Sequence, residues 1–441
     1  MNPAIPVIIL FVGFLVLLIS GLPLAFSLGG LAVLAILLFW GNVNVIFMLV
    51  ASVNSLTQNP TYLAVPMFIF MGALLEKSGV ADNLFDSMYI VMGRIKGGLL
   101  IAVVIICTFL AATTGVIAAS ITLMTMLGLP AMVKYKYNFR LAAGTIMAAG
   151  SLGQLLPPSV IMIVFAAQAQ LSVGRMFAGG IGAGFMFSLL FILYVIVRTL
   201  INPKDGPAIP KEEASQYSTG HKLGLLFKSI APTIFLIIAV LGSIVTGIAT
   251  PTEAAAVGCF GALILCLVNK RLNLDMIIKS CHSTTLACAM IFFIIVSASM
   301  FTHVFMGLRG HHLIGGLLTG LPFDRWVVLA IILLVLFLLT MFLDAYGAVM
   351  MSVPIIMPII VTLGFDPLWF SVIFICMMLI SFISPPFAYA AFYVKGASKT
   401  PIAIGDLYAA SWQYIAIYFV GIVLLSIFPQ IITFLPTLFF G

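Results

Sequence analysis

Long apolar segments separated by short polar ones run along almost the whole chain. Residues 1–75 contain no Asp, Glu, Lys or Arg, which is enough chain for more than three bilayer-crossing helices. Segment length predicts membrane spans at 5–20, 22–40, 61–77, 141–174 and 177–197, and again at 229–247, 251–268, 280–305, 367–394 and 408–435. The pattern therefore predicts an all-α polytopic membrane protein.

The start of the chain is expected to remain in the membrane as a span. Met1 to Pro6 lacks the Lys or Arg that opens a cleaved signal peptide, and the apolar run continues to Trp40.

Composition agrees with a membrane protein and argues against bound metal. Hydrophobic residues make up 63% of the 441 residues and charged residues 7%. The six cysteines and five histidines show no spacing typical of a metal site or of a disulfide framework. No cofactor is expected.

We attribute the net charge of +7 to the orientation of the chain in the membrane and not to binding of nucleic acid. Between the third and fourth span of each half lies a further apolar stretch, 97–133 and 326–361. If each stretch enters and leaves on the same side, 16 of the 19 basic residues face the cytoplasm, all but Arg175, Arg309 and Arg325. Both termini are then outside, and the polar linker 201–228 is cytoplasmic.

An internal repeat supports the same topology. Shifting the chain by 228 places Pro23 on Pro251, Gly30 on Gly258, Pro130 on Pro358, and Pro157-Pro158 on Pro385-Pro386. Five crossings per half is an odd number, so the second copy runs through the membrane inverted relative to the first. The predicted organisation is a first repeat over 1–200, the linker over 201–228 and a second repeat over 229–441.

The stretch 97–133 and its counterpart are predicted to be re-entrant helical hairpins. The first has uncharged arms at 97–112 and 116–133 around a polar tip at 113–115. The shorter arm reaches about 24 Å as a helix, less than a full hydrocarbon core. Two full spans remain the alternative, because charge alone does not separate the two arrangements.

The second tip, 343–347, contains Asp344, the only acid that we assign to the interior of a predicted apolar segment. A carboxylate inside a bilayer costs at least about 2.5 kcal/mol and marks a functional site by default. The alternative is that Asp344 caps the second arm of the hairpin.

The double prolines Pro157-Pro158 and Pro385-Pro386 interrupt two spans near their midpoints, which predicts two broken helices. A broken helix exposes carbonyl groups that can coordinate a cation and N–H groups whose positive dipole end can face an anion. Simple kinks in packed helices are the alternative, although kinks explain two symmetry-related pairs poorly.

Each hairpin tip is predicted to form a ligand site with the nearby break. The residues expected to bind Na⁺ are Thr113, Thr114, Gly115, Ser151, Gly153, Asp344, Ala345, Gly347, Ser381 and Ser384. The residues expected to bind substrate are Gln154, Pro157, Pro158, Ser159, Tyr346, Pro385 and Pro386.

Five segments together resemble the large membrane subunit of tripartite ATP-independent periplasmic (TRAP) transporters. They are "LPPS" at 156–159, "TPTEAAAVG" at 250–258, "LDAYGAVMMSVPIIMP" at 343–358, "SPPF" at 384–387 and "GDLY" at 405–408. The resemblance covers essentially the whole chain. In "TPTEAA" itself, Thr250, Pro251 and Glu253 have the spacing of a capping box, which indicates a structural role.

The resemblance implies an elevator-type carrier with a scaffold and a mobile transport domain, coupled to Na⁺ and importing a carboxylate. It implies two partners, a small four-helix membrane subunit and a periplasmic substrate-binding protein, and a location in a bacterial or archaeal cytoplasmic membrane. The dicarboxylate branch of this family usually carries Ser-Gly-Ser and then Asp at the first tip. Here the tip reads Thr113-Thr114-Gly115-Val116 without an acid, so the substrate is not carried over.

Three other functions fit the sequence less well. An intramembrane enzyme would need a buried acid-base or metal constellation, and the chain has no HExxH motif and no GxSxG in a span. A channel could use broken helices, but paired hairpins in inverted repeats suit alternating access better. A self-sufficient anion transporter of related fold, working without a binding protein, is the main alternative.

Overall fold

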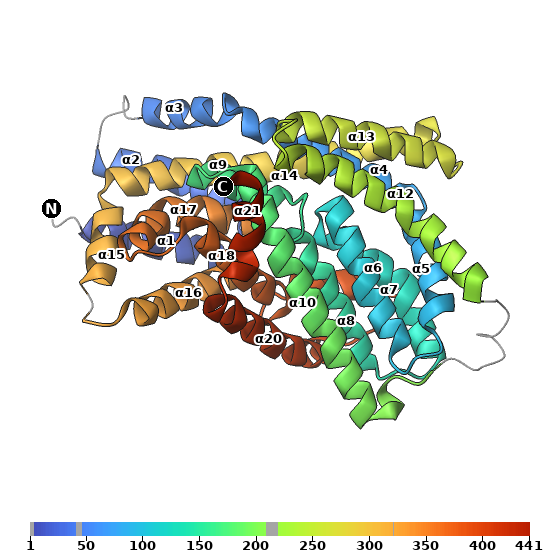
Figure 1. Ribbon diagram of the computed structural model, residues 1–441. Helices are drawn as coiled ribbons and strands as arrows, with labels where there is room; N and C mark the ends of the chain where they lie inside the picture. Colours follow the sequence, from blue (N-terminus) through green and yellow to red (C-terminus); the bar gives the residue numbers. More distant parts are fainter. Residues whose placement is uncertain (1–3, 41–45, 209–218, 321) are drawn as a thin grey trace.

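The computed structural model describes residues 4–40, 46–208, 219–320 and 322–441, and over these residues its regular elements are all helices. The first half contains α1 (Ala4–Ile19), α2 (Leu24–Phe39), α3 (Ile46–Thr57), α4 (Ala64–Lys77), α5 (Val80–Met92), α6 (Gly98–Thr114), α7 (Ile117–Lys134), α8 (Phe139–Ser151), α9 (Val160–Ala169) and α10 (Val173–Ile201). The second half contains α12 (Thr219–Val245), α13 (Pro251–Val268), α14 (Leu274–Gly307), α15 (Gly310–Thr319), α16 (Arg325–Phe342), α17 (Ala345–Thr362), α18 (Pro367–Ile383), α19 (Tyr389–Ala397), α20 (Ile404–Ile427) and α21 (Gln430–Phe440). Figure 1 shows their arrangement.

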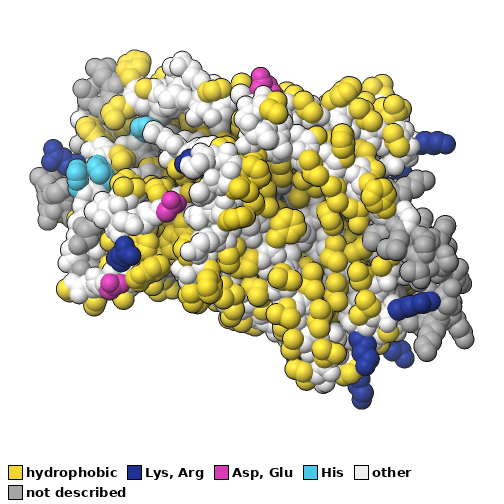
Figure 2. Space-filling model, viewed as in Figure 1, with side chains coloured by type: hydrophobic (Ala, Val, Ile, Leu, Met, Phe, Trp, Pro, Cys, Tyr) yellow, Lys and Arg dark blue, Asp and Glu magenta, His cyan; other side chains and the backbone are white. Residues whose placement is uncertain are grey.

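The molecule has the surface of a membrane protein. Seven helices in the described part of the chain are long and apolar enough to cross a bilayer, and α4 and α5 form an eighth candidate with a bend of 54°. On the face shown in Figure 2, apolar side chains cover the middle, and the Lys and Arg side chains gather toward the two ends. This distribution fits a hydrocarbon belt between two aqueous surfaces.

The helix bounds follow the sequence repeat closely. Adding 228 to the bounds of α7 gives 345–362, the bounds of α17, and the same shift moves α6 to 326–342 against Arg325–Phe342 for α16. The broken helix α8/α9 corresponds in the same way to α18/α19. The predicted hairpins and breaks are thus confirmed as helix–turn–helix elements in the expected register.

One difference between the two copies is that the first has two helices where the second has one. The shift moves α3 and α4 to 274–285 and 292–305, which lie within the single helix α14. In the first copy Asn59 caps a 3₁₀ turn by accepting the N–H of Thr61 at 3.0 Å, and Pro60 follows it. The position equivalent to Pro60 is Cys288, which keeps its N–H, so the second helix continues.

Packing between the copies is reciprocal. Helix α4 packs against α13 while α2 packs against α14, and α5 packs against α12 while α1 packs against α15. In the interior, α7 packs against α19 and α17 packs against α9. The second arm of each hairpin therefore contacts the second half of the other copy's broken helix, which interlocks the two repeats.

Some predicted spans require correction. Helices α3, α5 and α15 were not anticipated, because they are short or amphipathic. The predicted span 408–435 is wrong at its end: α20 stops at Ile427, and α21 turns back along α10, where an added Cβ at Gly182 would touch the carbonyl of Ile431. Pro429 has no N–H to continue α20.

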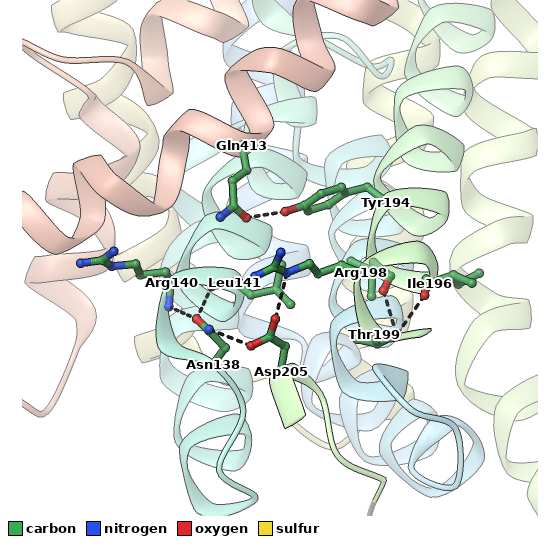
Figure 3. Close-up of polar contacts among 10 residues, drawn as sticks. Asn138, Arg140, Leu141, Tyr194, Ile196, Arg198, Thr199, Asp205 and Gln413 are labelled. Atoms are coloured by element: carbon green, nitrogen blue, oxygen red, sulfur yellow. Dashed lines mark hydrogen bonds and ion pairs between the residues drawn. The ribbon is translucent and has the colours of Figure 1, made fainter. Parts of the chain in front are cut away.

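The first residues of the linker are attached to the helices of the first copy (Figure 3). Asp205 forms an ion pair with Arg198, with Nε and Oδ2 2.8 Å apart, and accepts a hydrogen bond from the Asn138 side chain at 2.9 Å. The N–H of Gly97, just before α6, donates to the carbonyl of Gly206 at 2.8 Å. The linker therefore begins as part of the layer that holds the first hairpin and broken helix. Its centre, 209–218, lies outside the described residues.

Candidate functional site

The tip of the first hairpin, between α6 and α7, lies directly on the first helix break. Gly115 ends α6 in the left-handed conformation, with φ of 62°. A Cβ added there would meet the carbonyl oxygen of Pro158, and the Cα of Ser159 at 3.5 Å. On the other side, a Cβ added to Gly153 would be 3.4 Å from the carbonyl carbon of Val116. The predicted neighbours of tip and break are thus brought together.

The first break carries an open hydrogen-bond acceptor. Helix α8 passes through a 3₁₀ turn at Leu152–Gln154, and α9 begins after Ser159. Ser159 Oγ donates to the carbonyl of Gln154 at 2.6 Å and accepts the N–H of Met162 at 3.5 Å. Gln154 Oε1 is buried, and no described residue donates to it. A cation or a donor group on a substrate could use this oxygen.

Ser151, predicted as a cation ligand, is in contact with α20. Its hydroxyl donates to the carbonyl of Ala148 at 2.7 Å and lies 2.7 Å from the phenol oxygen of Tyr418. Tyr418 is fully buried and also donates to Ala148 at 3.0 Å. Tyr418 was not predicted from the sequence. The one indication of Tyr418 that the sequence offered is that α20 occupies the place in the second copy that α10 occupies in the first.

The hydroxyls of the first tip are engaged within α6. Thr113 Oγ1 and Thr114 Oγ1 each donate to the carbonyl of Leu110 at 2.9 Å. A hydroxyl has one hydrogen, so both oxygens keep lone pairs that can face a ligand. The predicted role of these residues as cation ligands stays a prediction.

The tip of the second hairpin, between α16 and α17, lies on the second break in the same manner. Thr340 Oγ1 is 2.6 Å from Ser381 Oγ, and the rings of Phe342 and Phe387 are 5.9 Å apart. Ser384 Oγ donates to the carbonyl of Ser381 at 3.5 Å. Thr340 was not predicted, because it lies before the polar tip, within the apolar arm.

The Pro385-Pro386 segment is connected to α20. Tyr408, the last residue of the "GDLY" motif, donates its hydroxyl to the carbonyl of Pro386 at 2.8 Å. In this structure both proline pairs, Pro157-Pro158 and Pro385-Pro386, have cis peptide bonds.

Asp344 has the geometry of a helix cap and also lies in a polar environment. Its Oδ2 accepts the N–H of Tyr346 at 3.0 Å at the start of α17. The phenols of Tyr346, Tyr389 and Tyr393 are near enough for electrostatic interaction with its carboxylate. The structure thus confirms the capping contact, and a cation-binding role for the charge stays a prediction.

Ala345 and Gly347, beside Asp344, are buried and close to the outer helices. A Cβ on Gly347 would be 2.7 Å from the side chain of Leu24 in α2 and 3.6 Å from that of Ile294 in α14. The second tip is therefore tightly packed between the two copies.

The first tip, in contrast, borders a cavity of about 220 Å³ between α4, α7 and α14. Its polar lining consists of Glu76, Thr114, Thr122, Ser283 and Thr284.

The acids of the apolar segments require a correction. Glu76 lies in the last turn of α4 and Glu253 in the first turn of α13, inside the predicted spans 61–77 and 251–268. The assignment of Asp344 as the only such acid was therefore wrong. Glu76 lies near the end of its predicted span, and this position in the sequence did not by itself indicate a role for its charge.

The chain matches a known protein family over nearly its whole length. The family described as "Tripartite ATP-independent periplasmic transporter, DctM component" matches residues 11–431. The "C4-dicarboxylate TRAP transporter large permease protein DctM" of Pseudomonas aeruginosa is 30% identical over 411 residues, covering 93% of each chain. The "Ectoine/5-hydroxyectoine TRAP transporter large permease protein UehC" of Ruegeria pomeroyi is 27% identical and covers 98% of this chain and 99% of the relative.

Two further similarities concern a longer protein and a shared fold. The "Isethionate TRAP transporter permease protein DctMQ" of Oleidesulfovibrio alaskensis is 29% identical and covers 90% of this chain but 61% of the relative. Among solved structures, the YdaH transporter of Alcanivorax borkumensis has a TM-score of 0.64 at 16% identity, covering 96% of this chain and 98% of that one. This last similarity shows the fold alone.

Proposed function

Since the chain belongs to the DctM component family of tripartite ATP-independent periplasmic transporters, we propose that it imports an organic acid together with Na⁺ and a periplasmic binding protein. The chain is a transporter permease subunit and not an enzyme. The observation that best supports the proposed mechanism is the pairing of each hairpin tip with a broken helix, Gly115 with Pro158 and Thr340 with Ser381.

Na⁺ coupling is supported by the oxygen atoms at the two pairs. Interrupted helices inside a protein offer backbone carbonyls to cations, and transporters of this architecture place coupling ions there. The first pair adds Gln154 Oε1, which has no partner among the described residues, and the second adds the carboxylate of Asp344. We propose one Na⁺ at each pair.

Charge balance links these sites to the substrate. Moving one negative charge into a cell costs about 2.3 kcal/mol for each 100 mV of membrane potential. Two Na⁺ ions cancel the charge of a dicarboxylate, whereas for a monoanion they leave a net positive charge that the potential drives inward. Uptake should therefore rise with Na⁺ with a Hill coefficient above one.

An elevator mechanism is supported by how the helices are grouped. The contacts of α7 with α19 and of α17 with α9 join both hairpins and both broken helices into one body. Outside it, α4 with α13 and α2 with α14 form a second group of reciprocal contacts. We propose that the first group moves through the membrane against the second, carrying substrate and Na⁺.

The partners follow from the family and remain proposals for this chain. The family description names a tripartite transporter, and the DctMQ relative has additional length beyond the region that this chain matches. We propose a small four-helix membrane subunit, a periplasmic binding protein and a location in a bacterial or archaeal cytoplasmic membrane, with both termini outside and the linker inside.

Reconstitution tests the proposal. The chain, its small subunit and its binding protein are placed in proteoliposomes, and uptake of labelled succinate, isethionate and ectoine is measured with an inward Na⁺ gradient or with K⁺ in place of Na⁺. We expect uptake of at least one compound, only with Na⁺ and only with all three components. Uptake without the binding protein would favour the self-sufficient carrier, and uptake that ignores Na⁺ would contradict Na⁺ coupling.

A further inference from the structure

The cavity at the first hairpin tip has the size of a small organic molecule. Its volume of about 220 Å³ corresponds to about seven water-sized groups, far more than one dehydrated ion needs. Its walls come from α4, the start of α7 and α14, so it lies between the hairpin and the helices around it. A substrate in this position would touch both groups of helices.

Three side chains of the cavity lining offer hydrogen-bond acceptors. Thr114 Oγ1 gives its hydrogen to the carbonyl of Leu110 at 2.9 Å, and Ser283 Oγ gives its hydrogen to the carbonyl of Ser280 at 3.0 Å. Each hydroxyl has a single hydrogen, so only lone pairs are left for a ligand. When it is ionised, the carboxylate of Glu76 is also an acceptor only. These three side chains suit a ligand group that donates hydrogen bonds.

The charge of the cavity lining also favours a ligand group that donates hydrogen bonds. Among the described residues that line the cavity, Glu76 is the one ionisable side chain, and these residues include neither Lys nor Arg. Lys77 follows Glu76 in the chain and acts on it electrostatically, but no ion pair reaches Glu76 from the described residues. A group with a positive charge would be attracted here, whereas a second carboxylate would be repelled.

The cavity also presents backbone donors. Val116 precedes α7 as its N-cap and has no side chain that could accept from the first turn. Ala118 and Ala119 of that first turn line the cavity, and N–H groups in the first turn of a helix lack partners within the helix. Such a helix start attracts a carboxylate. At the equivalent position in the second copy, Asp344 occupies the helix start with its own carboxylate.

From this arrangement we infer that the cavity binds a zwitterionic organic acid, with a cationic nitrogen group at Glu76 and a carboxylate at the start of α7. The inference rests on the proposed function and narrows its substrate class: an acid with an ammonium or amidinium group is accepted, and a dicarboxylate is not. Thr114 and Ser283 accept from the nitrogen group. Thr284 Oγ1, which is buried and has no partner among the described residues, is available to donate to the carboxylate.

Binding to the purified full-length chain in lipid nanodiscs tests the inference. Thermal stabilisation is titrated at neutral pH and constant ionic strength with ectoine, which carries an amidinium and a carboxylate, and with succinate and isethionate, which are anions only. We expect ectoine to bind at least about tenfold more tightly than either anion, because each anion must face Glu76 without a compensating charge. Tighter binding of succinate than of ectoine, or no binding of ectoine, would overturn the inference.

Single substitutions test whether the preference for ectoine arises in the cavity. Glu76→Gln should weaken ectoine binding by roughly tenfold or more and should narrow its advantage over succinate, because a charge-assisted hydrogen bond becomes a neutral one. Asp275→Asn is the matched control, since Asp275 is an exposed acid on α14, is paired with Lys279 and does not line the cavity. Equal affinities in the two variants would contradict the inference.

A second variant covers the case in which the Glu76 variant does not fold. Ser283→Ala removes an acceptor from an exposed position on α14 and should weaken ectoine binding about threefold while leaving succinate unchanged. An unchanged ectoine affinity in this variant also overturns the inference. Na⁺-driven uptake of succinate by the complete transporter would refute the zwitterion selectivity while leaving the proposed transport function intact.

Discussion

Replacing Asp344 by asparagine separates the two roles that this side chain can have. Asp344 caps α17 through the N–H of Tyr346, at 3.0 Å. Asparagine caps a helix about as well as aspartate but carries no charge, and alanine does neither. The two replacements therefore remove first the charge and then the cap.

General electrostatics and capping energies set the scale of each effect. A carboxylate and a cation about 4 Å apart interact by about 4 kcal/mol at an effective dielectric constant of about 20. If the cost of dehydration cancels up to half of this, Asp344→Asn weakens Na⁺ binding by about 2 to 4 kcal/mol, which is roughly 30- to 700-fold. Loss of the cap in Asp344→Ala lowers the free energy of unfolding further, by about 1 kcal/mol.

The assay measures the thermal midpoint of the purified protein against Na⁺ concentration, together with Na⁺-driven uptake. Without Na⁺, Asp344→Asn should melt at or above the wild-type temperature, because one intramembrane charge has been removed. With Na⁺, it should need at least about 30-fold more of the ion for half of the stabilisation. Asp366→Asn is the control, because Asp366 caps α18 through the N–H of Trp369 at 2.7 Å at the end of the helix farthest from the break. If Asp344→Asn keeps the wild-type Na⁺ dependence and only Asp344→Ala lowers the midpoint, the charge binds no cation and Asp344 is a helix cap.

Three further predictions test the tip contact, the linker attachment and the topology. Gly115→Ala should lower the thermal midpoint and uptake more than Gly247→Ala, because both residues have positive φ but only Gly115 has Pro158 in the path of an added Cβ; equal effects would show that the close approach of Gly115 to Pro158 is not needed. Asp205→Ala should cost about 1 to 3 kcal/mol of stability by leaving Arg198 and Asn138 without their shared partner, measured as a lower melting midpoint than that of a control at exposed Asp86; an unchanged midpoint would show that the linker is not held there. On a cysteine-free background, a cysteine at Lys204 should react with an impermeant maleimide only from the cytoplasmic side and one at Asp324 only from outside; labelling of both from one side would exclude the inverted arrangement.

Much of the fold was predictable because the relevant interactions are local. The capping box at 250–253 is one example: Thr250 Oγ1 accepts the N–H of Glu253 at 3.3 Å, and Glu253 Oε2 accepts the N–H of Thr250 at 2.8 Å. Residues three apart at a helix start meet whatever surrounds them. The same holds for the breaks, since a proline pair removes two N–H donors from any helix.

The candidate site was predictable in its backbone and less so in its side chains. The sequence correctly predicted that Gly115 and Asp344 sit at hairpin tips and that the double prolines break α8/α9 and α18/α19. It did not predict that Tyr418 would engage Ser151, or that Thr340 would pair with Ser381. Residue spacing along the chain does not say which face of a uniformly apolar helix meets which neighbour.

The sequence by itself determined most of the long apolar helices, the register of the two copies and the two interruptions, because apolar length, proline and capping residues act over a few positions. Only the tertiary structure decided what these elements enclose. Glu76, Thr122 and Ser283 come from three different helices and meet in one cavity because α4, α7 and α14 pack around the first tip. Packing of helices distant in sequence depends on the shapes of whole surfaces, and so the charge that we propose to select the substrate could be located only once those surfaces were in place.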